Sequence, residues 1–116
     1  MIGVRVPQRG EIWRIDPNPA KGQEQQEKRP WVILSDGAFN RHGIVIAVCV
    51  TNGAEKLDAR GLTVQISGCK TTGVAVISQV RAFDFRARDI EFLDRLPDKI
   101  TTDIGERVAS LVDPPR

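Results

Sequence analysis

The chain of 116 residues contains no tyrosine, one methionine, one histidine and two cysteines. Cys49 and Cys69 stand apart from each other and from His42, so their spacing matches no zinc motif and forms no metal-ligand cluster. Both cysteines lie inside or beside apolar runs, which favours reduced, buried thiols over the alternative of a disulfide. We therefore expect neither a metal nor a cofactor.

Long apolar runs are also missing. No segment approaches the length of a membrane-spanning helix, and residues 1–7 lack the apolar core of a signal peptide. We expect a cytoplasmic protein without membrane contact, and the length predicts a single domain over residues 1–116. The net charge is +2, from 17 basic and 15 acidic side chains, which by itself is too small to indicate a polyanion partner.

Apolar residues alternate with polar ones, or run together, in several short segments, which is the pattern of β-strands. We expect a central strand at 31–35, apolar on both faces, an edge strand at 91–95, and a flexible lead-in over residues 1–8. The other strands are expected at 11–16, 44–51, 62–66 and 74–84, the last of these bent near residues 78–79.

After Pro97 the spacing of apolar residues changes from that of strands to that of a helix. Ile100, Ile104, Val108 and Leu111 are spaced by four, four and three residues, which predicts an amphipathic helix over 98–112. Short strands followed by one such helix predict a mainly β fold, a small antiparallel barrel-like sheet with the helix over one opening or face.

The most informative segment is the polar loop over residues 17–28, which ends at Arg29 and Pro30. It holds two carboxylates and four amides, and Arg29 stands where the loop meets a buried strand. A guanidinium suits phosphate oxygens because its planar fork offers several donors, and Glu24 is a nearby proton acceptor. The loop indicates phosphate binding or phosphodiester chemistry, although most charged loops are only solvated surface. Residues 52–61 form a second polar loop, expected on the same rim.

Several segments together resemble the MazF/PemK family of toxin endoribonucleases from type II toxin–antitoxin systems. They occur in the family's order at residues 9–13 (RGEIW), 16–17, 22–26 (GQEQQ), 29–30, 39–40, 50–51, 72–74, 79–81 and 86–88. The resemblance implies an SH3-like twisted antiparallel barrel of the MazF/PemK/CcdB type, and a homodimer. It also implies sequence-selective, metal-independent cleavage of single-stranded RNA, mRNA above all, and neutralisation by a MazE/PemI-like antitoxin.

The resemblance also implies roles for single residues. The ribose 2′-hydroxyl would attack its own phosphate, leaving a 2′,3′-cyclic phosphate and a 5′-hydroxyl. Arg29 would stabilise the phosphorane, Thr51 would hold a phosphate oxygen, and Glu24 is the candidate base, with organising Arg29 or binding a base edge as alternatives. The residues expected to bind RNA are Gln23, Gln25, Gln26, Lys28, Asn52, Gln79 and Arg81.

Three positions depart from the PemK branch of the family. That branch has a histidine after the loop glycine and an arginine and an aspartate on a later strand. Here the matching residues are Gln23, Val76 and Ser78, so an acid–base scheme built on those groups cannot operate. Two other functions stay open: a CcdB-like toxin that binds gyrase without cutting RNA, and a weakly catalytic member that only binds RNA or an antitoxin.

Overall fold

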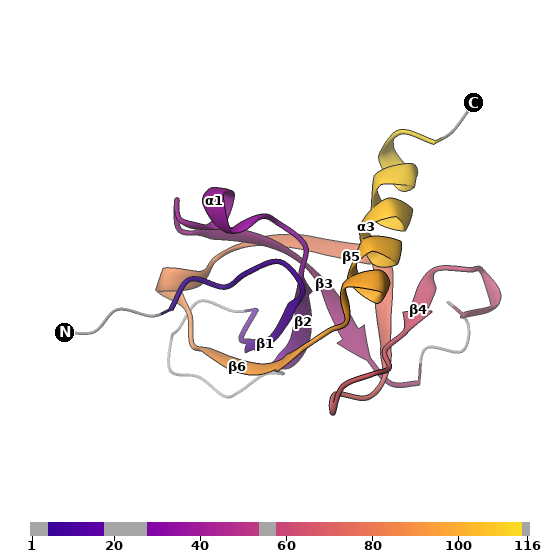
Figure 1. Ribbon diagram of the computed structural model, residues 1–116, viewed down its shortest axis with the longest axis horizontal. Helices are drawn as coiled ribbons and strands as arrows, with labels where there is room; N and C mark the ends of the chain where they lie inside the picture. The colour runs from indigo at the N-terminus through magenta and orange to yellow at the C-terminus, as the bar shows by residue number, and fades with distance from the viewer. Residues whose placement is uncertain (1–4, 18–27, 54–57, 115–116) are drawn as a thin grey trace.

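The computed structural model describes residues 5–17, 28–53 and 58–114 (Figure 1). In chain order these residues form strands and helices with the following bounds: β1 (Glu11–Ile15), β2 (Arg29–Ile33), α1 (Gly37–Asn40), β3 (Ile44–Thr51), β4 (Thr63–Gln65), β5 (Val74–Asp84), the 3₁₀ helix η1 (Phe85–Ala87), β6 (Ile90–Arg95) and α3 (Asp98–Val112). Within these residues every expected strand is present, and β2 begins two residues earlier than its apolar run.

The strands form one antiparallel sheet with the order β4-β5-β3-β2-β1-β6. Figure 1 shows strands β1, β2, β3 and β6 curling around a common centre, with α3 standing beside β5 and β4. The mainly β prediction is confirmed. The strand expected in the centre, β2, lies between β1 and β3, and the strand expected at an edge, β6, is an edge.

Two hydrophobic clusters occupy the two faces of the sheet. Strand β3 sends Val48 and Val50 into one cluster, and Ala47 and Cys49 into the other. Because successive side chains of a strand point to opposite faces, a slip of one residue would exchange the two sets. Burial of one large aliphatic or aromatic side chain is worth about 1.5 to 3 kcal/mol, so the register of β3 against β2 is strongly specified.

The pairing of β5 with β3 changes register where the sequence predicts a bend. Val80 pairs with Val48 of β3, but the next regular pair joins Val50 to Ala75, so the register shifts between them. The extra residues of β5 over 76–79 form an irregularity, which bends a strand and increases its twist. Because of the bend, the single strand β5 pairs with β3 in the curled part of the sheet and with β4 at its edge.

Helix α3 has the predicted bounds, but its apolar stripe is covered unevenly. Ile104 is fully buried and Ile100 and Val108 pack against the same cluster. Leu111 is 49% exposed and Val112 is 84% exposed, because the last turns extend beyond the sheet (Figure 1). None of the helices in the described residues is long and apolar enough to cross a membrane.

The N-terminal lead-in differs from the expectation over its described part. Glu11 is only 5% exposed, and its Oε1 accepts hydrogen bonds from the Gln8 backbone N–H (2.9 Å) and from Trp13 Nε1 (3.0 Å). Arg5 Nη1 donates to Oε2 at 2.9 Å, and Pro7 O accepts from the buried Asn40 amide at 2.7 Å. Residues 5–8 are therefore held against the sheet, because a buried carboxylate needs donors to offset its desolvation.

Candidate active site

Arg29 and Thr51 meet at one end of the sheet. They are the first residue of β2 and the last residue of β3. Trp31 pairs with Cys49 across these two strands, and extending that antiparallel register by two residues sets Arg29 opposite Thr51. Arg29 Nη1 donates a hydrogen bond to Thr51 Oγ1 at 3.0 Å. The convergence expected from the sequence is present.

The pair lies between solvent and the hydrophobic interior. Arg29 is exposed and Thr51 is half-buried, while Cys49, beneath them, is buried as a free thiol. Burial raises the pKa of the Cys49 thiol, and the charge and hydrogen bonding of the nearby Arg29 guanidinium only partly oppose this. The thiol is therefore neutral at pH 7 and does not compete with a phosphate for the guanidinium charge.

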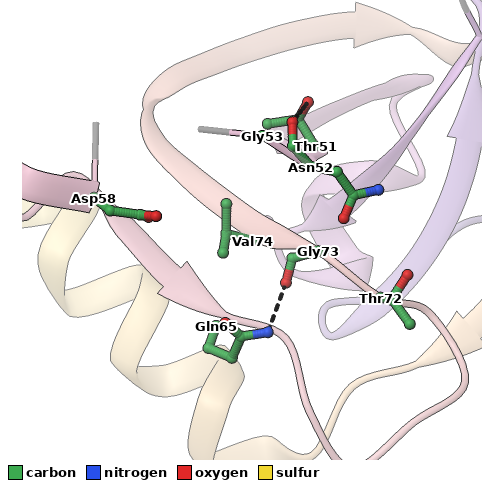
Figure 2. A pocket seen from close by; sticks show the side chains of 8 residues that line it. All are labelled: Thr51, Asn52, Gly53, Asp58, Gln65, Thr72, Gly73 and Val74. Atoms are coloured by element: carbon green, nitrogen blue, oxygen red, sulfur yellow. Dashed lines mark hydrogen bonds between the residues drawn. The ribbon is translucent and has the colours of Figure 1, made fainter. Parts of the chain in front are cut away.

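A polar pocket of about 310 Å³ opens beside Thr51 (Figure 2). We call it the Thr51 pocket; its lining residues are Thr51, Asn52, Gly53, Asp58, Gln65, Thr72, Gly73 and Val74. Figure 2 shows the end of β3 on one side of this space, with Asp58 and Gln65 on others. The lining offers amide, hydroxyl and carboxylate groups, which can recognise an unstacked base by its edges.

Two side chains of this pocket are fixed by hydrogen bonds. Gln65 Nε2 donates to Gly73 O at 3.2 Å (Figure 2), and Asp58 Oδ1 accepts from the Thr63 hydroxyl. The bond from Gln65 joins β4 to the start of β5. The pocket walls are therefore held by the sheet itself, which favours a preformed site.

Gly73 keeps the end of β3 in place. Its φ is +119°, and a Cβ there would lie 2.7 Å from Thr51 O and 3.2 Å from Asn52 Oδ1. Gly73→Ala is expected to strain this contact by on the order of 1 to 3 kcal/mol and to displace Thr51 from Arg29. The RNA cleavage that the family resemblance implies should fall by about tenfold or more, as measured by initial rates.

Gly61→Ala is the matched control for that variant. Gly61 also has a positive φ, of +73°, but a Cβ there meets no atom within 4 Å. Both variants carry backbone strain, so both should unfold at somewhat lower denaturant concentration. Only Gly73→Ala should lose cleavage, and equal activity of the two variants would contradict the role given to Gly73.

The other described residues expected to bind RNA are spread more widely. Asn52 lines the Thr51 pocket. Lys28 pairs with Asp89 at 2.9 Å, which raises the pKa of the lysine. Gln79 and Arg81 are exposed on β5, and Arg81 lies opposite Ala47, four residues before Thr51 on β3. Strand geometry places Arg81 roughly 13 Å along the sheet from Thr51, outside this pocket.

Four predicted residues, Gln23, Glu24, Gln25 and Gln26, lie outside the described residues. At two of the positions that depart from the PemK branch, Val76 is fully buried and Ser78 is exposed. A buried valine offers no polar group to substrate. Among residues 5–17, 28–53 and 58–114, no group of three or more His, Cys, Asp or Glu side chains gathers as metal ligands do.

Sequence reasoning missed several residues of the Thr51 pocket. Thr72, Gly73 and Val74 belong to a segment that carried the family resemblance, but no role followed from that segment. Asp58 belongs to the second polar loop, which was expected on this rim, but no role followed for it. Gln65 gave no signal, because a single polar residue on a short strand resembles any solvated one, and it reaches the pocket through the pairing of β4 with β5.

Comparisons with known proteins agree with one another. The sequence model of the family described as "PemK-like, MazF-like toxin of type II toxin-antitoxin system" matches residues 8–112. Endoribonuclease PemK of Escherichia coli is 35% identical over 108 residues, which cover 90% of this chain and 81% of that protein. Endoribonuclease toxin MazF of E. coli K12 is 34% identical over 89 residues, covering 76% of this chain and 78% of MazF. A MazE–MazF crystal structure (Form-II) from Deinococcus radiodurans matches with a TM-score of 0.82 and 27% identity, over 95% of this chain and 98% of that one.

Proposed function

The chain belongs to the PemK-like, MazF-like toxin family of type II toxin–antitoxin systems, and on that premise we propose that it is an endoribonuclease that cuts single-stranded RNA at selected sequences. The observation that carries the proposal is the hydrogen bond between Arg29 and Thr51 beside a polar pocket. A guanidinium and a hydroxyl held 3.0 Å apart at an exposed strand end can share one phosphate group.

The chemistry follows from what this pair can supply. The 2′-hydroxyl of the ribose attacks the adjacent phosphorus, its proton passes to a base, and the bond from phosphorus to the 5′-oxygen breaks. The Arg29 guanidinium stabilises the negative charge of the five-coordinate phosphorane, and Thr51 donates to one of its oxygens. The leaving 5′-oxygen takes up a proton, so the products are a 2′,3′-cyclic phosphate and a 5′-hydroxyl. No metal takes part in this scheme, and Glu24 is the proposed base.

We assign recognition of the RNA sequence to the residues around Arg29 and Thr51. The Thr51 pocket receives a nucleotide next to the scissile phosphate, with the Asn52 amide facing it. Gln79 and Arg81 on β5, Lys28, and the loop residues Gln23, Gln25 and Gln26 are proposed as further RNA contacts. Amides read base edges because each offers both donors and acceptors, whereas the cations contact phosphates without reading sequence.

The proposed partners are a second copy of this chain and a MazE/PemI-like antitoxin. The solved MazE–MazF complex supports an antitoxin partner, since its toxin shares this fold. Several large apolar side chains are exposed and are candidates for coverage by a homodimer interface; they are Phe39, Ile44, Ile46, Leu111 and Val112. We place the activity in the cytoplasm, with mRNA as the main substrate.

The function is tested with the purified full chain and a long RNA in the presence of EDTA. Primer extension maps the cut sites, and the new 5′ ends should accept phosphate from polynucleotide kinase without prior dephosphorylation. A synthetic RNA with one 2′-deoxy nucleotide at the mapped site should resist cleavage, because its nucleophile is missing. If the RNA stays intact and gyrase is inhibited, the proposal is contradicted and the protein is a CcdB-like toxin. If the RNA is bound but not cut, the proposal is also contradicted and the protein is a family member that only binds RNA.

A further inference from the structure

A second pocket, of about 420 Å³, adjoins the Thr51 pocket. Asn52 and Thr72 line both pockets, so they form a shared wall between them. The remaining walls come from β1, β2, β6 and the hairpin over residues 66–73. Of the described residues expected to bind RNA or to take part in the reaction, Asn52 alone lines it. A polymer bound at Thr51 that continues past Asn52 and Thr72 enters this second pocket.

Strand β1 supplies the first cation of the second pocket. Arg14 Nη1 donates to Glu91 Oε1 of β6 at 2.6 Å, across the register that pairs these two residues. A guanidinium carries five N–H donors, and the bond to Glu91, its one side-chain hydrogen bond within the described residues, orients the fork without using its full capacity. Arg14 is therefore a positioned cation at the wall of the pocket, partly exposed to solvent.

The hairpin supplies the second cation, and Asp94 holds that hairpin in place. Asp94 Oδ2 accepts hydrogen bonds from the backbone N–H groups of Lys70 (2.8 Å) and Thr71 (2.9 Å) and from Thr71 Oγ1 (3.1 Å). Its Oδ1 accepts from the Arg95 N–H at 2.9 Å. Burial acts to raise the pKa of Asp94, but the bonds from Thr71, Arg95 and Lys70 outweigh it and lower that pKa. The carboxylate stays ionised and its charge is distributed among four donors, while the Lys70 ammonium forms no ion pair within the described residues.

We propose that this second pocket, the Arg14–Lys70 pocket, binds the phosphate and ribose of the nucleotide beyond the one held in the Thr51 pocket. The proposal rests on the RNA-cleaving function proposed above and extends its substrate site. Arg14 and Lys70 contact the phosphate, and the hydroxyl groups of Thr71 and Thr72 face the ribose. The site is a backbone contact that positions the RNA for cutting at Arg29.

The lining favours an RNA backbone over a base or a protein segment. Among the described residues no aromatic ring lines the pocket, so none of them offers a base a surface to stack on. Of these lining residues, Leu93 is the one large aliphatic side chain apart from Pro30. Its shared wall with the Thr51 pocket makes it continuous with the position of the scissile phosphate. We therefore expect the contact to add affinity without adding sequence preference.

The test compares RNA binding by the wild-type chain and by Arg14→Gln, Lys70→Gln and the double variant. The probes are an RNA that extends several nucleotides on both sides of the mapped cut site and a short RNA that ends at the nucleotide of the Thr51 pocket, each with a 2′-deoxy group at the cut. Lys99→Gln, on the exposed face of α3, is the control for loss of one positive charge. All replaced side chains are at least partly exposed, so the fold should persist.

The double variant should bind the long RNA about tenfold more weakly and the short RNA as tightly as the wild type does. The slope of log affinity against log salt should fall by about 0.7 for each phosphate contact removed from a single strand. Changing the base at the extended position should have no effect. Unchanged affinity and slope for the long RNA in the double variant would overturn the proposal, and would leave the pocket to a ligand such as an acidic protein segment. A wild-type chain that neither cuts nor binds RNA would instead refute the function itself.

Discussion

Arg29→Ala is expected to raise the barrier to RNA cleavage by about 2 to 4 kcal/mol, roughly a 30- to 1,000-fold slower reaction. The reason is that the phosphorane carries more charge than the substrate phosphate, and the variant lacks the donor aimed at it. Arg29 lies at the exposed strand end and is held by Thr51 at 3.0 Å, so its loss should leave the core intact. Single-turnover rates on an RNA with one mapped cut site provide the measurement.

Two further variants make that result specific. Arg29→Lys retains a positive charge but loses the planar fork, so its rate should lie between those of the wild type and the alanine variant. Arg107→Ala removes an exposed arginine from α3, where it pairs with Asp103 at 2.9 Å, and should cleave at the wild-type rate. Full activity of Arg29→Ala would end the assignment of this residue to the reaction.

Glu11→Ala is expected to lower the free energy of unfolding by about 2 to 4 kcal/mol, because it leaves buried donors without an acceptor. The Glu11 side chain is only 7% exposed, and its carboxylate accepts from the Gln8 N–H, Trp13 Nε1 and Arg5 Nη1. For a chain of this size the loss corresponds to a fall in melting temperature on the order of 10 °C. Urea titration at pH 7, followed by circular dichroism, gives the free energies directly.

The same carboxylate predicts an acid-sensitive stability. Burial acts to raise the pKa of Glu11, but the hydrogen bonds from Trp13, Gln8 and Arg5 prevail and hold that pKa below its ordinary value of 4.5. In the unfolded chain the group takes up a proton near pH 4.5, while in the folded chain it does so only at lower pH. Its contribution is therefore complete above about pH 4.5 and is lost as the pH falls through the folded pKa.

Glu11→Gln tests this linkage, with Glu91→Gln as the control for an exposed carboxylate that pairs with Arg14. The amide cannot titrate, so the stability of Glu11→Gln should depend less on pH below 4.5 than that of the wild type. Glu91→Gln is measured in the same way, as the same change of side chain at an exposed position. Parallel stability curves for the wild type and Glu11→Gln between pH 5 and pH 3 would contradict the prediction.

Much of the fold follows from short-range pattern. The alternation in β1 and β4, the continuous apolar run of β2 and the four-four-three spacing in α3 each depend on residues within a few positions of one another. Such patterns report which face of an element is buried, and they predicted the position of each of these elements. The meeting of Arg29 with Thr51 was expected from family resemblance, and the antiparallel register of β2 and β3 provides its physical basis.

Other features have no local signal. Glu11 reads as an ordinary polar position in an alternating strand, yet it is buried because Arg5, Gln8 and Trp13 surround it with donors. Residues 5–8 were expected to be flexible for the same reason, since nothing in their own sequence shows that a carboxylate and the Asn40 amide hold them. The exposure of Leu111 likewise depends on where the sheet ends and not on the helix itself.

The sequence by itself determined the strands, the helix and the two-faced apolar pattern, because these depend on residue types and their near neighbours. It also pointed to Arg29 as the candidate for phosphate chemistry, which the variants above test. Only the tertiary structure decided which polar side chains share a pocket. Asp58, Gln65 and Thr72 line one pocket with Thr51, and Arg14 and Lys70 line the next, because the strand order and the hairpin over 66–73 bring distant residues to one end of the sheet. Contacts of that kind are set by chain closure and packing over long sequence separations, which no local pattern records.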